Sequence, residues 1–149
     1  MAELLLFAAD RAQHVNFLVK PALEAGRIVI SDRYADATAA YQGAGRGFDE
    51  KTIEQVIDLA TGGLKPDLTL FFDISIDKAI LRTKTRADDE TVKNRMDQET
   101  TAFYERVRRG YLKIAEKEPQ RFRLVEAGGS IDEVHARVSE IVDRFLNAP

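Results

Sequence analysis

The stretch VISDRYADATAAYQGAGRG, residues 29–47, decides the predicted fold. It opens on the end of "RIVISD", in which three apolar residues follow one another, as is typical of a parallel strand covered on both faces. A helix is predicted directly after it, at about residues 35–43, and the glycines beyond the helix let the chain turn back. Strand and helix signals alternate in this way along the whole chain, which predicts one α/β domain, residues 1–149, with a parallel sheet.

Asp32 and Arg33 stand at the end of the predicted strand. Ligands of open parallel sheets bind beyond the carboxyl ends of the strands, so both side chains are expected at a ligand site. A strand-end aspartate can hold a hydrated Mg²⁺, and an arginine beside it offers a fork of donors suited to a phosphate. A structural ion pair beside a helix N-cap is the alternative that these two residues leave open.

The other predicted elements follow from hydrophobic spacing. Apolar residues recur at helical spacing over residues 2–19, and Pro21 and Gly26 are expected to end that helix. The further strands are "LTLFFDI" and "FRLVEA". The further helices lie at 50–61, near 76–84, from about 91 to 117, and at 130–146, where Ser130 and Glu133 have capping-box spacing.

Composition excludes several classes of protein. The chain has 22 basic and 25 acidic side chains and a net charge of −3, which gives no overall attraction to nucleic acid or anionic lipid. It has no cysteine, which suits a reducing compartment. Its longest apolar run, "LLLFAA", is far shorter than the roughly 20 residues that span a bilayer. We therefore expect a cytoplasmic protein with no nucleic-acid or membrane partner.

Two further groups of residues suggest nucleotide chemistry. Phe7 and Arg11 are four residues apart on a predicted helix, so a ring and a guanidinium project side by side and could bind a base. The segment "RTKTRADDETVKNR", residues 82–95, holds several basic side chains that could close on transferring phosphates. The alternatives are that Phe7 is a core residue with Arg11 in solvent, and that residues 82–95 form an ordinary solvated connection.

Five longer stretches carry a resemblance to the bacterial thymidylate kinase family. These are "FAADRAQHV", "KPALEAGRIVISDRY", "AYQGAGRG", "GGLKPDLTLFFDI" and "FYERVRRGYLKIAEKEPQRF", in that order. The resemblance implies a three-layer α/β fold of the P-loop nucleoside monophosphate kinase type. It also implies transfer of the γ-phosphoryl group of ATP to dTMP, giving dTDP and ADP, with Mg²⁺ as cofactor and a homodimer as the assembly.

The resemblance also implies contacts to the thymine and the sugar. Phe7 matches the phenylalanine that stacks on the thymine ring, and Arg11 matches the arginine that contacts a thymine carbonyl. Thr38 falls where the family carries a small polar residue near the base. Tyr41 corresponds to a residue under the deoxyribose, and Gln42 to one near the base.

Catalytic roles are implied for four residues. Arg33 matches the residue that grips the monophosphate, and Asp32 the acid that helps to order Mg²⁺ and the phosphates, through water on the metal. Residues 82–95 match the family lid, so Arg86 and Arg95 are the candidates for the basic side chains that close over the phosphates.

One motif of P-loop kinases is absent from the sequence. No G-x-x-x-x-G-K-[ST] occurs, and "GAGRG", residues 43–47, follows a predicted helix and lacks the lysine. The chain therefore looks like a thymidylate kinase without its first, P-loop strand and helix. That strand is central in the family sheet, so we expect two unpaired inner edges and no cooperative thermal unfolding above about 50 °C.

Two other functions stay open. One is a non-catalytic domain that keeps the nucleotide pocket or only the dimer face. The other is a different P-loop kinase of deoxynucleosides or nucleotides, which would share the strand-Asp-Arg pattern but not the five stretches together. If the chain is a thymidylate kinase, its activity without a P-loop is also open.

Overall fold

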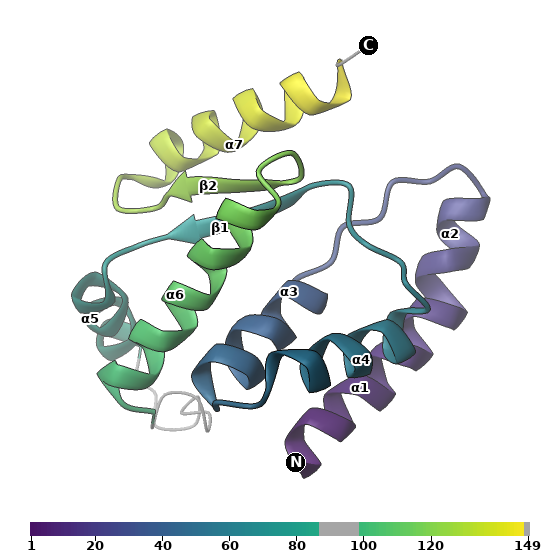
Figure 1. Ribbon diagram of the computed structural model, residues 1–149. Coiled ribbons are helices and arrows are strands. Elements are labelled where there is room, and N and C mark those ends of the chain that lie inside the picture. Colours follow the sequence, from purple (N-terminus) through teal and green to yellow (C-terminus); the bar gives the residue numbers. More distant parts are fainter. Residues whose placement is uncertain (87–98, 148–149) are drawn as a thin grey trace.

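The computed structural model describes residues 1–86 and 99–147 (Figure 1). A single continuous helix begins the chain, made of α1 (Ala2–His14), the π-helical turn η1 (Val15–Val19) and α2 (Lys20–Glu24). The prediction that Pro21 ends this helix is wrong. A proline clashes with the carbonyl four residues back in an α-helix, but here the wider π-turn directly precedes it, with Lys20 N donating to Val15 O. The helix ends instead at Glu24, and Gly26, the other predicted terminator, turns the chain two residues later with φ 70°.

The predicted strand "RIVISD" does not form, and this is a correction. Residues 27–31 have no regular secondary structure, and the sheet of the described residues has two strands, neither of them from this segment. Ile28 is 76% exposed and Ile30 94% exposed. A strand needs a hydrogen-bonded neighbour, and no described strand pairs with this segment, so its apolar pattern did not determine the outcome.

A helical hairpin follows. α3 (Ala35–Thr38) continues into the π-helical η2 (Ala39–Gly45), and α4 (Glu50–Thr61) runs beside α1. Asp49 caps α4 by accepting a hydrogen bond from Thr52 N, and Gly62 ends it in the left-handed conformation, φ 61°. These elements confirm the helices predicted near 35–43 and at 50–61.

The two strands are β1 (Thr69–Asp73) and β2 (Phe122–Glu126). They pair in parallel, from Thr69 opposite Phe122 to Asp73 opposite Glu126, which confirms both predicted strands and the parallel sheet. No described strand pairs with the other edge of β1. That unpaired edge agrees with the expectation of a gap in the sheet.

Three helices surround the strands. α5 (Ile76–Arg86) follows β1, and α6 (Thr101–Lys117) and α7 (Ile131–Leu146) flank β2 in the chain. Figure 1 shows α7 above the strands, whereas α6 and α3 lie below them. α6 was predicted to begin at about residue 91, but Thr100 caps it with a non-helical backbone, and residues 91–98 lie outside the described residues. α7 has the predicted capping box of Ser130 and Glu133.

The core joins η2 to α6. Ala40, Phe103 and Val107 form its buried centre, and two glycines let the helices approach closely. A Cβ on Gly110 would lie 2.8 Å from Ala44 Cβ, and a Cβ on Gly45 would lie 2.8 Å from Phe103 Cε2. This contact fixes the helix that carries several of the predicted site residues.

Candidate functional site

The turn before α3 has a strained backbone at Arg33. Its φ is 64°, a left-handed conformation that Cβ disfavours. Ser31 Oγ donates a hydrogen bond to Arg33 O at 3.4 Å, and the hydroxyl of the next residue, Tyr34, donates to Leu64 O at 3.1 Å. Strain of this kind persists only where the surroundings impose it, and it is concentrated at functional sites.

The structure brings Arg33 and Tyr41 together, two residues to which the resemblance assigns separate roles in one site. The Arg33 guanidinium lies over the Tyr41 ring, 4.2 Å from its centroid, which is cation–π geometry. Tyr41 is itself held edge-on by Phe103 and Tyr111, at centroid distances of 6.1 and 6.3 Å. Arg33 is exposed, so its side chain has a fixed platform on one side and solvent on the other.

Arg11 reaches the same turn from α1. Its guanidinium lies over the Tyr34 ring at 4.9 Å, and its Nη1 donates to Arg33 O at 3.4 Å. Burial lowers the pKa of Arg11, and the nearby Arg33 lowers it further, whereas Tyr34 raises it. Phe7, one turn earlier on α1, is 48% exposed. The alternative of a core Phe7 with a solvated Arg11 is therefore not what the structure shows.

Thr38 and Gln42 are both buried. Gln42 Nε2 donates to Glu3 Oε1 at 3.0 Å, and Glu3 also binds the guanidinium of Arg46. Arg46 in turn pairs with Glu99 at 2.6 Å, and these carboxylates raise its pKa. The structure thus uses Gln42 in the contact between α1 and η2.

Asp32 is exposed, beside Arg33. Among residues 1–86 and 99–147, no group of three or more His, Cys, Asp and Glu side chains could hold a metal ion. Mg²⁺ in kinases keeps several waters and is bound through one or two carboxylates plus the phosphates of the substrate. A single exposed carboxylate beside an exposed arginine fits that mode.

A largely buried ion pair ties α3 to the sheet, and sequence reasoning missed it. Arg121 Nη2 lies 2.7 Å from Asp36 Oδ1 and Arg121 Nη1 lies 2.8 Å from Asp36 Oδ2. Thr69 Oγ1 donates to the same Oδ2 at 2.8 Å, and Glu118 also binds Arg121. These hydrogen bonds raise the pKa of Arg121. The partners are 85 residues apart, and no local spacing signals such a pair.

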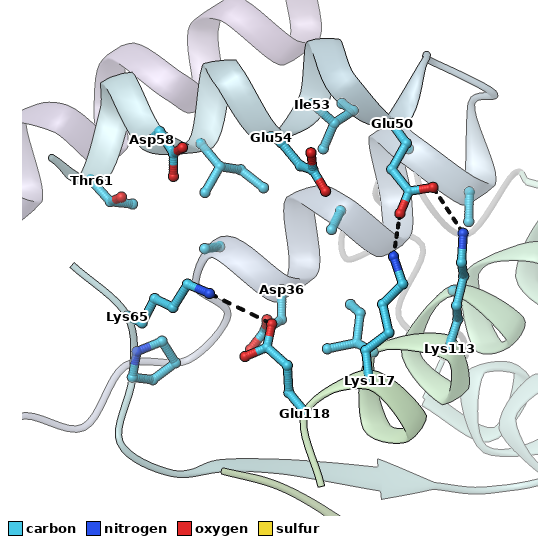
Figure 2. Close-up of a pocket in the computed structure, with 18 of the residues that line it drawn as sticks. Asp36, Glu50, Ile53, Glu54, Asp58, Thr61, Lys65, Lys113, Lys117 and Glu118 are labelled. Atoms are coloured by element: carbon cyan, nitrogen blue, oxygen red, sulfur yellow. Dashed lines mark hydrogen bonds and ion pairs between the residues drawn. The ribbon is translucent and has the colours of Figure 1, made fainter. Parts of the chain in front are cut away.

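A cavity of about 510 Å³ lies between α3–η2, α4 and α6. Figure 2 shows Glu50, which lines the cavity, bound to Lys113 and Lys117 at 2.9 and 2.6 Å, and Asp36 among the other lining side chains. The two lysines hold the pKa of Glu50 at about 2. These three charged side chains connect α4 and α6.

The cavity is separate from the predicted site. Ala39 and Gly43 line it, and Tyr41 lies two residues from each, so helical geometry directs Tyr41 to the opposite face. None of the predicted site residues that the structure describes lines the cavity.

Comparisons with known proteins decide the family. A sequence model of the family described as thymidylate kinase matches residues 1–138. The chain belongs to the thymidylate kinase family. The thymidylate kinase of Syntrophotalea carbinolica is 47% identical over 152 residues, covering 99% of this chain and 69% of that protein. The thymidylate kinase of Nitratidesulfovibrio vulgaris is 47% identical over 151 residues, covering 99% and 70%.

The fold is similar to that of a solved thymidylate kinase. The crystal structure from Ehrlichia chaffeensis superimposes with a TM-score of 0.71 at 34% identity, covering 95% of this chain and 64% of that one. The family and this likeness confirm the α/β fold of the P-loop kinase type. The chain spans about two thirds of the length of these three thymidylate kinases.

The assignment of Arg86 and Arg95 to a lid over the phosphates stays a prediction. Arg86 is the last residue of α5, and Arg95 lies outside the described residues. Among the described helices, none is long and apolar enough to cross a membrane.

Proposed function

We propose that this chain holds the dTMP-binding part of a thymidylate kinase. The observation that carries the proposal is the convergence of Arg11 and Arg33 on one strained turn, with the Tyr41 ring beneath the Arg33 guanidinium. The two cations come from α1 and from the end of residues 27–33, and exposed Phe7 lies one turn away from Arg11. An aromatic face, a base-reading arginine and a phosphate-binding arginine are what a pyrimidine monophosphate requires.

Within this site each residue has a distinct task. Phe7 stacks on the thymine and Arg11 donates to a thymine carbonyl, with Thr38 and Gln42 behind the base. Tyr41 supports the deoxyribose, and Arg33 holds the monophosphate so that an oxygen of the phosphate faces the donor. Asp32 holds Mg²⁺ through its waters, and Mg²⁺ neutralises charge on the transferring phosphoryl group.

The donor side of the reaction requires more. The family uses ATP as phosphate donor, and we propose that Arg86 and Arg95 close over its phosphates. Phosphoryl transfer in P-loop kinases depends on the glycine-rich cradle and its lysine, and the sequence contains no such motif. We therefore expect dTMP binding without appreciable transfer of phosphate from ATP to dTMP by this chain alone.

The test is calorimetric titration of the chain with dTMP, in parallel with Arg33→Ala and the control Arg27→Ala. Arg27 is exposed and lies six positions before Arg33 in the same segment. Binding to the wild type and the control, and its loss in Arg33→Ala, would support the proposal. Equal binding by all three, or no binding by any, would contradict it. ATP and Mg²⁺ are then added to the same samples to measure dTDP.

We also propose a homodimer formed through the α1 face. Leu6 is 71% exposed and Phe17 78% exposed, and both lie on the helix that carries the base-binding pair. Large apolar side chains gathered on one helix face are typical of an interface between subunits.

Because the chain has no cysteine, a reducing compartment suits it, and we place the protein in the cytoplasm.

A further inference from the structure

The carbonyl of Arg33 is held by two donors. Arg11 Nη1 and Ser31 Oγ each reach Arg33 O at 3.4 Å. One donor is local to the turn, whereas Arg11 comes from α1, 22 residues earlier in the chain. The backbone that these donors hold has φ 64°. A residue with a Cβ leaves this conformation unless its surroundings keep it there.

Tyr34 fixes the position of Arg11. The Arg11 guanidinium stacks on the Tyr34 ring at 4.9 Å, and the Tyr34 hydroxyl is anchored to Leu64 O at 3.1 Å. An arginine has a planar fork of five donors, and the contact with Arg33 uses one of them. The same guanidinium can therefore hold the turn and donate to a second group.

We propose that Arg11 is a positioning residue for the phosphate subsite, because it holds the strained turn that aims Arg33, and that it thereby couples base binding to phosphate binding. The inference rests on the proposed function and extends it. In this arrangement, a base that orders Arg11 also orders the Arg33 turn. A phosphate on Arg33 in turn favours the position of Arg11 that binds the base, since such coupling is reciprocal.

Charge adds a second reason for the coupling. Arg11 and Arg33 are neighbouring cations, and burial together with Arg33 lowers the pKa of Arg11. Among the groups that face Arg11, Asp10 and Tyr34 act in the opposite direction. A phosphate dianion on Arg33 would cancel the repulsion between the two guanidinium groups. Both subsites therefore gain when the phosphate is bound.

The experiment separates the base from the phosphate. Calorimetry measures the binding of 2-deoxyribose 5-phosphate, which has no base, and of thymidine, which has no phosphate, to the wild type, Arg11→Lys and Phe7→Leu. Arg11→Lys keeps the charge but loses the planar fork. We expect Arg11→Lys to lower the affinity for 2-deoxyribose 5-phosphate by about fivefold, whereas Phe7→Leu should leave that affinity unchanged. Both variants should lower the affinity for thymidine. An unchanged affinity of Arg11→Lys for the sugar phosphate would overturn the proposal.

If no nucleotide binds, the proposed function is refuted, but the positioning role of Arg11 is not. That role can be tested by a measurement without ligand. At positive φ the amide and α protons of a residue lie unusually close, so their cross-peak in a nuclear Overhauser spectrum is strong. We expect a strong Arg33 cross-peak in the wild type and in Arg27→Lys, and a weak one in Arg11→Lys and in Tyr34→Leu. A cross-peak retained at full strength in both variants would refute the positioning role.

Discussion

Replacing Gly110 by alanine sets two effects of known size against each other. Gly110 lies in the interior of α6, where alanine is more favourable by about 1 kcal/mol from helix propensity alone. The new Cβ would lie 2.8 Å from Ala44 Cβ and 3.1 Å from Ala40 Cα. Ala40 is fully buried, and its backbone cannot rotate away. Overpacking of this kind costs about 1–3 kcal/mol, so we expect Gly110→Ala to lower the free energy of unfolding by about 1 kcal/mol net.

The assay is urea unfolding followed by circular dichroism. For a slope of about 2 kcal/mol/M, the midpoint should fall by about 0.5 M with the slope unchanged. Arg109→Ala, at an exposed position of the same helix, is the control and should change stability by less than about 0.5 kcal/mol. In the Ala44→Gly background one of the two clashes is gone, so Gly110→Ala should cost less there. A higher midpoint for the single variant would refute the packing argument.

Three further predictions concern charge and assembly. Asp36→Asn leaves Arg121 without its bidentate carboxylate and should cost about 3 kcal/mol in urea unfolding; a cost under 1 kcal/mol would contradict it. The pKa of Glu50 is held at about 2, below its ordinary 4.5, so the stability from its lysine pairs is present above pH 4.5 and lost as pH falls toward 2. In Glu50→Gln the urea midpoint should depend less on pH over that range, and a pH dependence equal to that of the wild type would argue against this prediction. Leu6→Glu should sediment as a monomer, whereas the wild type should sediment as a dimer. A wild type that sediments as a monomer would refute the proposed α1 interface.

Local signals predicted the elements that depend on local interactions. The capping box of Ser130 and Glu133 fixes the start of α7 within one turn, and β1 and β2 each had a neighbour with which to pair. Residues 27–31 carry an equally apolar pattern, yet no described strand pairs with them. Strand formation depends on a partner that the pattern does not contain. Pro21 misled for a related reason, because the π-turn that accommodates it has no simple sequence signal.

The site was predictable in its parts but not in its connections. The family resemblance assigned Arg33 and Tyr41 separate roles in one site, and the structure has the two side chains in contact. It did not indicate that Arg11 bonds the Arg33 carbonyl, nor that Arg121 binds Asp36 across 85 residues. Such contacts depend on where the folded chain brings distant segments together. The cavity has the same origin, since its lining comes from α3–η2, α4, α6 and the segments that follow them.

Because the φ of Arg33 is positive, selection for stability and selection for ligand binding should favour different residues at position 33. In a library randomised at position 33, a screen for resistance to proteolysis would favour glycine and asparagine, because these residues adopt φ 64° at little cost. A screen for retention on an immobilised nucleotide monophosphate would favour arginine. The variants ranked first by one screen would rank low in the other, as is usual where an activity is maintained at the expense of stability.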